Sequence, residues 1–221
     1  MRACMPANFL HDVTEHTMEI RQDNEEYRHL TFSKKGDSAY LFHLTTWPGY
    51  LCISGDMGCY VFSRLKDMFE FFKTDWRKDD LYKSINPDYW GEKVQAGNLL
   101  GITRFDPEDF KNTVNRSTRQ WMRDHYHETT RDERKRLMQA IEYEVFSELE
   151  NENRDVLMHN AIQFTHKVTS RLTFEFQDFW ENTFQEYTYE YLWCCYAIAW
   201  GITSMMKPNN RGLCYENSTS K

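Results

Sequence analysis

The stretch that decides the fold class is residues 40–63, YLFHLTTWPGYLCISGDMGCYVFS. It holds three short runs rich in aromatic and β-branched residues, separated by Pro48-Gly49 and by Gly55-Asp56-Met57-Gly58. Short apolar runs between Pro-Gly and Gly-Asp turns are typical of an antiparallel meander, and a loop bracketed by glycines suits a tight hairpin. We therefore predict three consecutive antiparallel strands over this stretch.

The sequence on either side extends this prediction. TMEIR and RHLTF, which lie upstream, read as two further strands and place the sheet at about residues 17–63. From Arg64 onward the apolar residues follow a helical period, as in Leu65, Met68, Phe69 and Phe72. No alternation of strands and helices is seen. The predicted fold class is α+β, with an N-terminal antiparallel β-meander covered by a C-terminal set of α-helices over about 64–206.

Several helix starts are marked by capping residues. The capping signals are Asn86-Pro87, Asp106-Pro107 and the capping-box pattern Thr130-Arg131-Asp132-Glu133. A seam at a spacing of four (Leu137, Ile141, Val145 and Leu149) predicts a continuous helix after Thr130, and residues 151–153 predict its break. Residues 174–184 and 189–206 are also predicted to be helical, the second of them buried.

Composition places the chain among folded globular proteins. It has 221 residues, 16% of them aromatic, a formal net charge of −7 and few glycines and prolines. We expect a single domain over residues 1–207, followed by a flexible tail over 208–221. The uncharged run between Glu190 and Lys207 is too short for a membrane span, and the N-terminal residues do not read as a signal peptide. These features predict a cytoplasmic protein with free cysteines.

Charge is distributed unevenly along the helical region. Residues 111–138 carry eight basic and four acidic side chains, whereas residues 139–166 carry one basic and six acidic side chains. One interpretation is a basic face for phosphate and an acidic face that docks a basic partner. The other is two solvated helix faces whose charges serve solubility. The candidate nucleic-acid-binding residues are Arg116, Arg119, Arg123, Arg131, Arg134, Lys135 and Arg136. The candidate partner-binding acidic residues are Glu142, Glu144, Glu148, Glu150, Glu152 and Asp155.

Signals for catalysis or metal binding are weak. The sequence contains no nucleophile elbow, P-loop or dinucleotide-binding glycine motif. His125 and His127 would point to different faces of a helix, although in an extended segment they would share one and a metal site would be open to them. Asp56 reads as a turn residue rather than a catalytic acid, and Cys52 with Cys59 lacks further zinc ligands. We predict no catalytic residues, no metal and no cofactor, and lean against an enzyme.

Several blocks of the sequence resemble an uncharacterised family of accessory proteins encoded by tailed bacteriophages and prophages. The blocks are Trp47-Pro48-Gly49, Gly55-Asp56-Met57-Gly58 and Asp67-Met68-Phe69-Glu70-Phe71-Phe72, with further matches between about residues 9 and 202. The family carries no established activity, so the resemblance implies a context, the cytosol of an infected bacterium, and no mechanism.

Three functions follow as hypotheses. The first is stoichiometric binding to a host protein complex through the acidic residues, with inhibition of an antiviral defence or of a nucleic-acid-processing system as the outcome. The second is a metal-dependent hydrolase or nuclease. The third is direct nucleic-acid binding through the basic 111–136 region. The identity of the partner and the oligomeric state are not encoded in any recognisable pattern.

Overall fold

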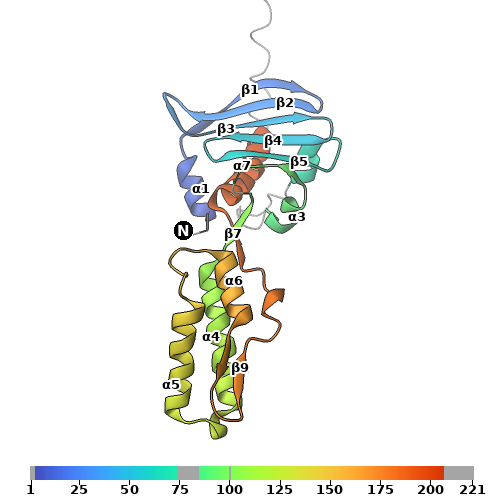
Figure 1. The fold of residues 1–221 in the computed structure, drawn as a ribbon. Coiled ribbons are helices and arrows are strands. Elements are labelled where there is room, and N and C mark those ends of the chain that lie inside the picture. The colour runs from blue at the N-terminus through green and yellow to red at the C-terminus, as the bar shows by residue number, and fades with distance from the viewer. Residues whose placement is uncertain (1–2, 74–84, 100, 207–221) are drawn as a thin grey trace, which may run out of the picture. The chain divides into compact units, whose positions relative to one another are not determined.

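The structure is a computed structural model that describes residues 3–73, 85–99 and 101–206 (Figure 1). The predicted tail over 208–221 lies outside these residues. The chain divides into two compact units, one formed by Met1–Thr103 with Tyr187–Lys221 and the other by Arg104–Glu186. Each unit has a hydrophobic core of its own. That residues 1–207 fold and unfold as a single domain therefore stays a prediction.

Unit 1 is built on a six-stranded sheet in which every strand pairs antiparallel with its sequence neighbour. This confirms the predicted α+β class with an N-terminal antiparallel meander. The strands are β1 (His16–Asn24), β2 (Tyr27–Lys34), β3 (Asp37–Trp47), β4 (Tyr50–Gly55), β5 (Gly58–Ser63) and β6 (Val94–Ala96). The short β6 was not predicted, and it lies after α2 and α3 in the chain rather than within the predicted sheet region at 17–63.

The hairpin between β4 and β5 shows how local sequence sets the register. Gly55 pairs with Gly58, which leaves Asp56 and Met57 as a two-residue loop. Both glycines have positive φ, +152° and +103°, and a Cβ on Gly55 would lie 2.1 Å from the carbonyl oxygen of Leu41. Only glycine fits such a turn without strain. The resulting register buries alternate side chains of both strands on the same face of the sheet.

Helix α7 (Tyr189–Met206) covers one face of this sheet (Figure 1). It is buried for most of its length, as predicted for the last helix. Gly201 marks its close approach, since a Cβ there would lie 2.8 Å from Cδ1 of Leu44 and 3.0 Å from Cζ of Phe32. The described residues of the unit also form three shorter helices: α1 (Pro6–Asp12), α2 (Met68–Phe72) and α3 (Pro87–Gly91). α7 included, no helix in the described part of the chain is both long and apolar enough to cross a membrane.

Unit 2 is mainly helical. Its helices are α4 (Pro107–Asp124), η2 (Tyr126–Glu128), α5 (Arg131–Ala140), η3 (Ile141–Val145), α6 (Arg154–Gln163) and η4 (Phe179–Glu181). Strands β8 (Thr165–Lys167) and β9 (Thr173–Glu175) form an antiparallel pair within it. A further pair joins β7 (Thr103–Phe105) to β10 (Gln185–Tyr187), where the chain enters and leaves the unit.

The predicted helix starts are confirmed. Asn86 accepts a hydrogen bond from the Tyr89 backbone N–H, and Asp106 accepts from the N–H groups of Glu108 and Asp109. Thr130 and Glu133 form the predicted capping box at the start of α5. Hydrogen bonds from the backbone N–H of Thr130 and, to a smaller extent, from the Thr130 hydroxyl lower the pKa of Glu133 below its ordinary value. Because a capping side chain satisfies free N–H groups locally, these starts are readable without tertiary information.

The predicted helix over residues 174–184 is wrong. The segment contains the end of β9 and the single turn η4 instead. Phe174 and Phe176 are buried while Glu175 and Gln177 are exposed, which is the period of two that belongs to extended chain. The high density of aromatic residues in this segment concealed that alternation.

The apolar seam after Thr130 is confirmed for its first three members and changes in geometry, while the fourth, Leu149, is half-buried. Leu137, Ile141 and Val145 are buried along it. The α-helical geometry of α5 ends at Ala140, and residues 141–145 form the π-helix η3. The predicted continuous helix ends at Val145, earlier than the predicted break at 151–153, so Leu149 lies in a turn rather than in the helix. Asn153 then caps α6 by accepting a hydrogen bond from the backbone N–H of Val156.

Candidate anion-binding site on helix α4

Helix α4 has two chemically different sides. Phe110, Val114 and Thr118 are its buried residues, and they recur at a spacing of four. At 100° per residue this places them on one side of the helix, with positions 112, 116, 119 and 123 on the opposite side and position 115 on the flank between the two. The helix therefore packs into the core of unit 2 by one side and presents the other away from that core.

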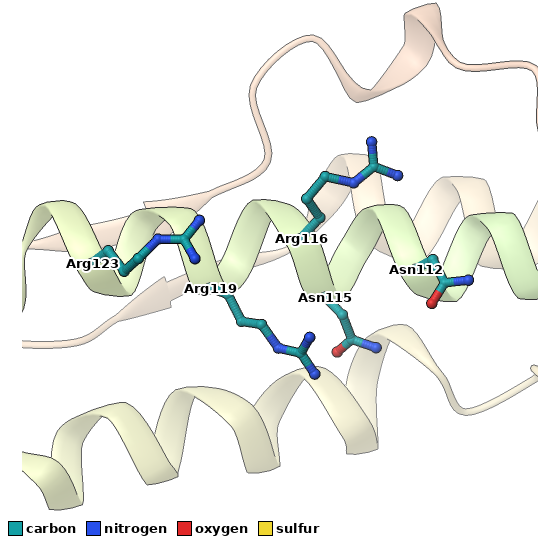
Figure 2. Close-up of a pocket in the computed structure, with 5 residues that line it drawn as sticks. All are labelled: Asn112, Asn115, Arg116, Arg119 and Arg123. Carbon is teal, nitrogen blue, oxygen red and sulfur yellow. The ribbon is translucent and has the colours of Figure 1, made fainter.

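The side turned away from the core carries a shallow groove of about 340 Å³. It is lined by five side chains of α4, which we call the arginine groove: Asn112, Asn115, Arg116, Arg119 and Arg123. Figure 2 shows all five on α4, with the side chain of Arg116 directed to one side of the helix and those of Arg119 and Asn115 to the other. The three arginines belong to the basic residues singled out from the sequence, and the helical period brings them together.

Two of the three arginines of this groove donate hydrogen bonds to neutral side chains. Arg116 donates to the hydroxyl of Thr113 at 3.3 Å, and Arg123 donates to the side-chain oxygen of Gln120. Within residues 3–73, 85–99 and 101–206, no carboxylate forms an ion pair with Arg116, Arg119 or Arg123. Guanidinium groups remain protonated at any physiological pH. The groove is consequently a local concentration of positive charge on an acidic protein.

The chemistry of the groove suits oxyanions. Arginine presents several N–H donors in a planar fork that matches a phosphate or carboxylate, and the amide groups of Asn112 and Asn115 add neutral donors. Arg116 and Arg123 are seven residues apart, about 10 Å along the helix axis. A span of this length allows the arginines to contact more than one phosphate of the same strand.

The other predicted basic residues lie on α5 and are not all available. Arg131, Lys135 and Arg136 are exposed. Arg134 is used internally, because its guanidinium donates to the backbone carbonyl and the hydroxyl of Thr129 and lies 4.6 Å from the ring centre of Tyr126. The structure thus divides the predicted basic set into the arginine groove on α4, three exposed side chains on α5 and one structural arginine.

The predicted acidic residues follow one continuous segment from η3 to the start of α6. Glu142 and Glu144 are exposed on η3 and flank Tyr143, whose side chain is 83% exposed. The remaining members are half-buried Glu148, exposed Glu150 and Glu152, and Asp155, which pairs with Arg154 at 3.4 Å. The sequence signalled the acids but not the π-helical turn that presents Tyr143 between two of them.

The residues considered as metal ligands from the sequence do not come together with further ligands in the described part of the chain. His125 ends α4, where its Nδ1 lies 3.0 Å from the Trp121 carbonyl oxygen and its ring stacks on the indole of Trp121 at 4.4 Å. His127 lies in η2 against the ring of Tyr126. Asp56 is a loop residue whose backbone N–H donates to the carbonyl of Leu41. Among the described residues, no three histidine, cysteine, aspartate or glutamate side chains are grouped so as to hold a metal ion.

Comparison with known proteins gives no further guide to this site. No family model matches the sequence, and neither a curated protein nor a solved structure is found to be similar to it. The resemblance to phage-encoded accessory proteins therefore stays a prediction.

Proposed function

We propose that the protein is a binding protein whose arginine groove contacts the phosphate backbone of a nucleic acid. The observation that carries this proposal is the grouping of Arg116, Arg119 and Arg123 around one groove, with no carboxylate paired to any of them among the described residues. Phosphate contacts of this kind position a nucleic acid without reading its sequence. Of the functions considered from the sequence, nucleic-acid binding gains most from this geometry.

The charge of the rest of the chain sets the expected strength. The net charge of −7 repels a polyanion at long range, so the local groove has to supply the attraction. Three phosphate contacts would release bound counterions. Because of this release, a plot of log affinity against log salt concentration should have a slope of roughly −2 to −3. We expect moderate, strongly salt-dependent affinity rather than tight binding.

The test is binding of short fluorescently labelled DNA, followed by anisotropy over a salt series starting at about 50 mM. The variant R116Q/R119Q/R123Q removes the groove charges and keeps good helix formers in place. We expect it to lose at least about tenfold in affinity and most of the salt slope. The matched control K35Q/R64Q/R171Q removes three charges from exposed positions elsewhere and should bind like the wild type. Absence of binding by the wild type, or equal loss in both variants, would overturn the proposal.

A second candidate function rests on the acidic segment. Tyr143 is exposed between Glu142 and Glu144, and tyrosine is one of the residues enriched in protein-binding hot spots. The three residues lie in a π-helical turn, and such turns occur frequently at functional sites. The partner would be a protein with a basic surface, and the resemblance to phage accessory proteins makes a host complex the expected one.

This second candidate is tested by affinity capture from bacterial lysate with two variants side by side. A partner bound through the acidic segment should be lost from E142Q/Y143A/E144Q and retained by R116Q/R119Q/R123Q. Weakening of the captured complex by salt would support charge complementarity. A partner retained equally by both variants, or no partner above background, argues against this function.

A further inference from the structure

A second groove lies beside the arginine groove and shares Arg116 with it. Its volume is about 460 Å³, within the range of ligand-binding sites. One wall is formed by Ser117, Gln120, Trp121 and Asp124 of α4, and the other by residues 174–177 around the end of β9. We call it the tryptophan groove. The two grooves are therefore adjacent on unit 2, and one arginine borders both.

Trp121 provides a fixed aromatic surface in the tryptophan groove. Its indole stacks on His125 at 4.4 Å and meets the ring of Phe174 edge-on at 5.5 Å. The residue is half-buried and lines the groove. An aromatic ring held on two sides loses little entropy when a second flat ring packs against it. Nucleic-acid bases are such rings, and each has a face available for stacking once it leaves the duplex.

The charges of the two grooves differ in sign. The arginine groove has three guanidinium groups and two amides, whereas the tryptophan groove holds the carboxylates of Asp124 and Glu175 against the one shared guanidinium of Arg116. Each carboxylate accepts a hydrogen bond from a neighbouring amide, Asp124 from Gln120 and Glu175 from Gln177, both at 2.8 Å. A phosphate is attracted to the first groove and repelled from the second. A neutral group that donates hydrogen bonds fits the second.

We propose that the two grooves together bind single-stranded nucleic acid, with phosphates on the arginine groove and an unstacked base that carries an amino group in the tryptophan groove. Carboxylates accept hydrogen bonds from exocyclic amino groups, such as that of cytosine, whereas thymine has none to offer. A duplex keeps its bases stacked and paired, out of reach of a groove in the protein surface. This inference rests on the proposed function and adds to it the strandedness and base type of the ligand.

The experiment compares three labelled probes of equal length: oligo-dC, oligo-dT and a duplex. Wild-type protein should bind oligo-dC several-fold more tightly than oligo-dT, and either single strand more tightly than the duplex. The variant E175Q should reduce the preference for dC over dT, because a neutral acceptor binds an amino group more weakly than a carboxylate does. Its affinity for oligo-dT should stay equal or rise, since one repulsion of phosphate is removed. Glu175 is exposed, so this change leaves the core intact.

Two further variants separate the interpretations. E181Q removes an exposed carboxylate elsewhere in unit 2 and should keep the wild-type preference. W121F keeps an aromatic ring packed against the core but offers a smaller stacking surface, and it should narrow the difference in affinity between single strand and duplex. If no probe binds, both the proposed function and this inference fail. If all three probes bind equally and E175Q changes nothing, the inference fails while phosphate binding by the arginine groove stands.

Discussion

The guanidinium of Arg28 donates two parallel hydrogen bonds to the carboxylate of Asp67, at 2.8 and 2.9 Å, across 39 residues of chain. The same carboxylate accepts the backbone N–H of Phe69 at 2.9 Å and so caps α2. The guanidinium also lies 4.6 Å from the centre of the Phe69 ring. One ion pair thereby attaches the start of α2 to strand β2 and keeps the helix over the sheet.

Removal of this carboxylate should destabilise the protein. We expect D67A to lower the free energy of unfolding by about 1–3 kcal/mol. The Asp67 side chain is only 28% exposed, and its carboxylate accepts hydrogen bonds both from the Arg28 guanidinium and from the Phe69 backbone N–H. Asp23 is the matched control, since it approaches Arg28 at 3.5 Å but is 42% exposed, and D23A should cost less than about 1 kcal/mol. Urea denaturation measures both, and equal losses would show that the bidentate pair has no special role.

The same pair predicts a dependence of stability on pH. Burial raises the pKa of Asp67, but the hydrogen bonds from Arg28 and the Phe69 N–H outweigh burial and hold the pKa below its ordinary value. A carboxyl with a lowered pKa in the folded state contributes stability above its unfolded pKa of about 3.9, and loses it as the pH falls through the folded value. The stability difference between wild type and D67N should therefore be full at neutral pH and shrink only below about pH 4. A difference that stays constant in acid would contradict this assignment.

The parts of the fold that could be predicted are those encoded by neighbouring residues. The turn at Gly55-Asp56-Met57-Gly58 fixes a register by itself, and the caps at Asn86, Asp106 and Thr130 satisfy local N–H groups. Strand β6 could not be predicted, because three residues carry too little pattern and its pairing with β5 is a long-range event. The wrong helix over 174–184 shows the opposite problem, since dense phenylalanines satisfy several periods at once.

The candidate site was half predictable for the same reason. Arg116, Arg119 and Arg123 share a helix, so their spacing already places them on one side of it. The internal use of Arg134 depends on where the chain turns at Thr129, and no pattern in the sequence reports that contact. The tryptophan groove combines α4 with residues 174–177, which are about fifty positions away, and only the folded chain brings them together.

The two cores predict that damage to one unit stays local in hydrogen exchange. Phe110 is fully buried in the core of unit 2, where it contacts the rings of Phe179 and Phe184 edge-on. F110A removes a large buried side chain, which typically costs about 3–5 kcal/mol. We expect amide exchange to accelerate across residues 104–186, while strands β2 to β5 keep wild-type protection. Faster exchange in those strands as well would show that the chain unfolds as the single domain expected from the sequence.

The cysteines of β4 and β5 should react as a pair. The Sγ atoms of Cys52 and Cys59 lie 3.7 Å apart, with Cys59 exposed and Cys52 half-buried. Burial, and then the neighbouring Cys59, raises the pKa of Cys52 to about 12. Cys194 and Cys195 are buried in α7, and burial raises the pKa of both thiols. Because the thiolate is the reactive form, Cys59 should be the first of these four to react with an aromatic disulfide reagent near pH 8.

The proximity of Cys52 then determines the product. Its sulfur should attack the mixed disulfide formed on Cys59, expel the second thiolate of the reagent with loss of the Cys52 proton, and leave a Cys52–Cys59 disulfide. In a C214S background, the protein that keeps both Cys52 and Cys59 should thus release two equivalents of coloured thiolate per chain. Its mass should fall by that of two hydrogen atoms. C52S should release one equivalent and retain the adduct, and C59S should lose the fast reaction. A stable adduct on Cys59 in the presence of Cys52 would mean that the two sulfurs do not approach in solution as they do in the structure.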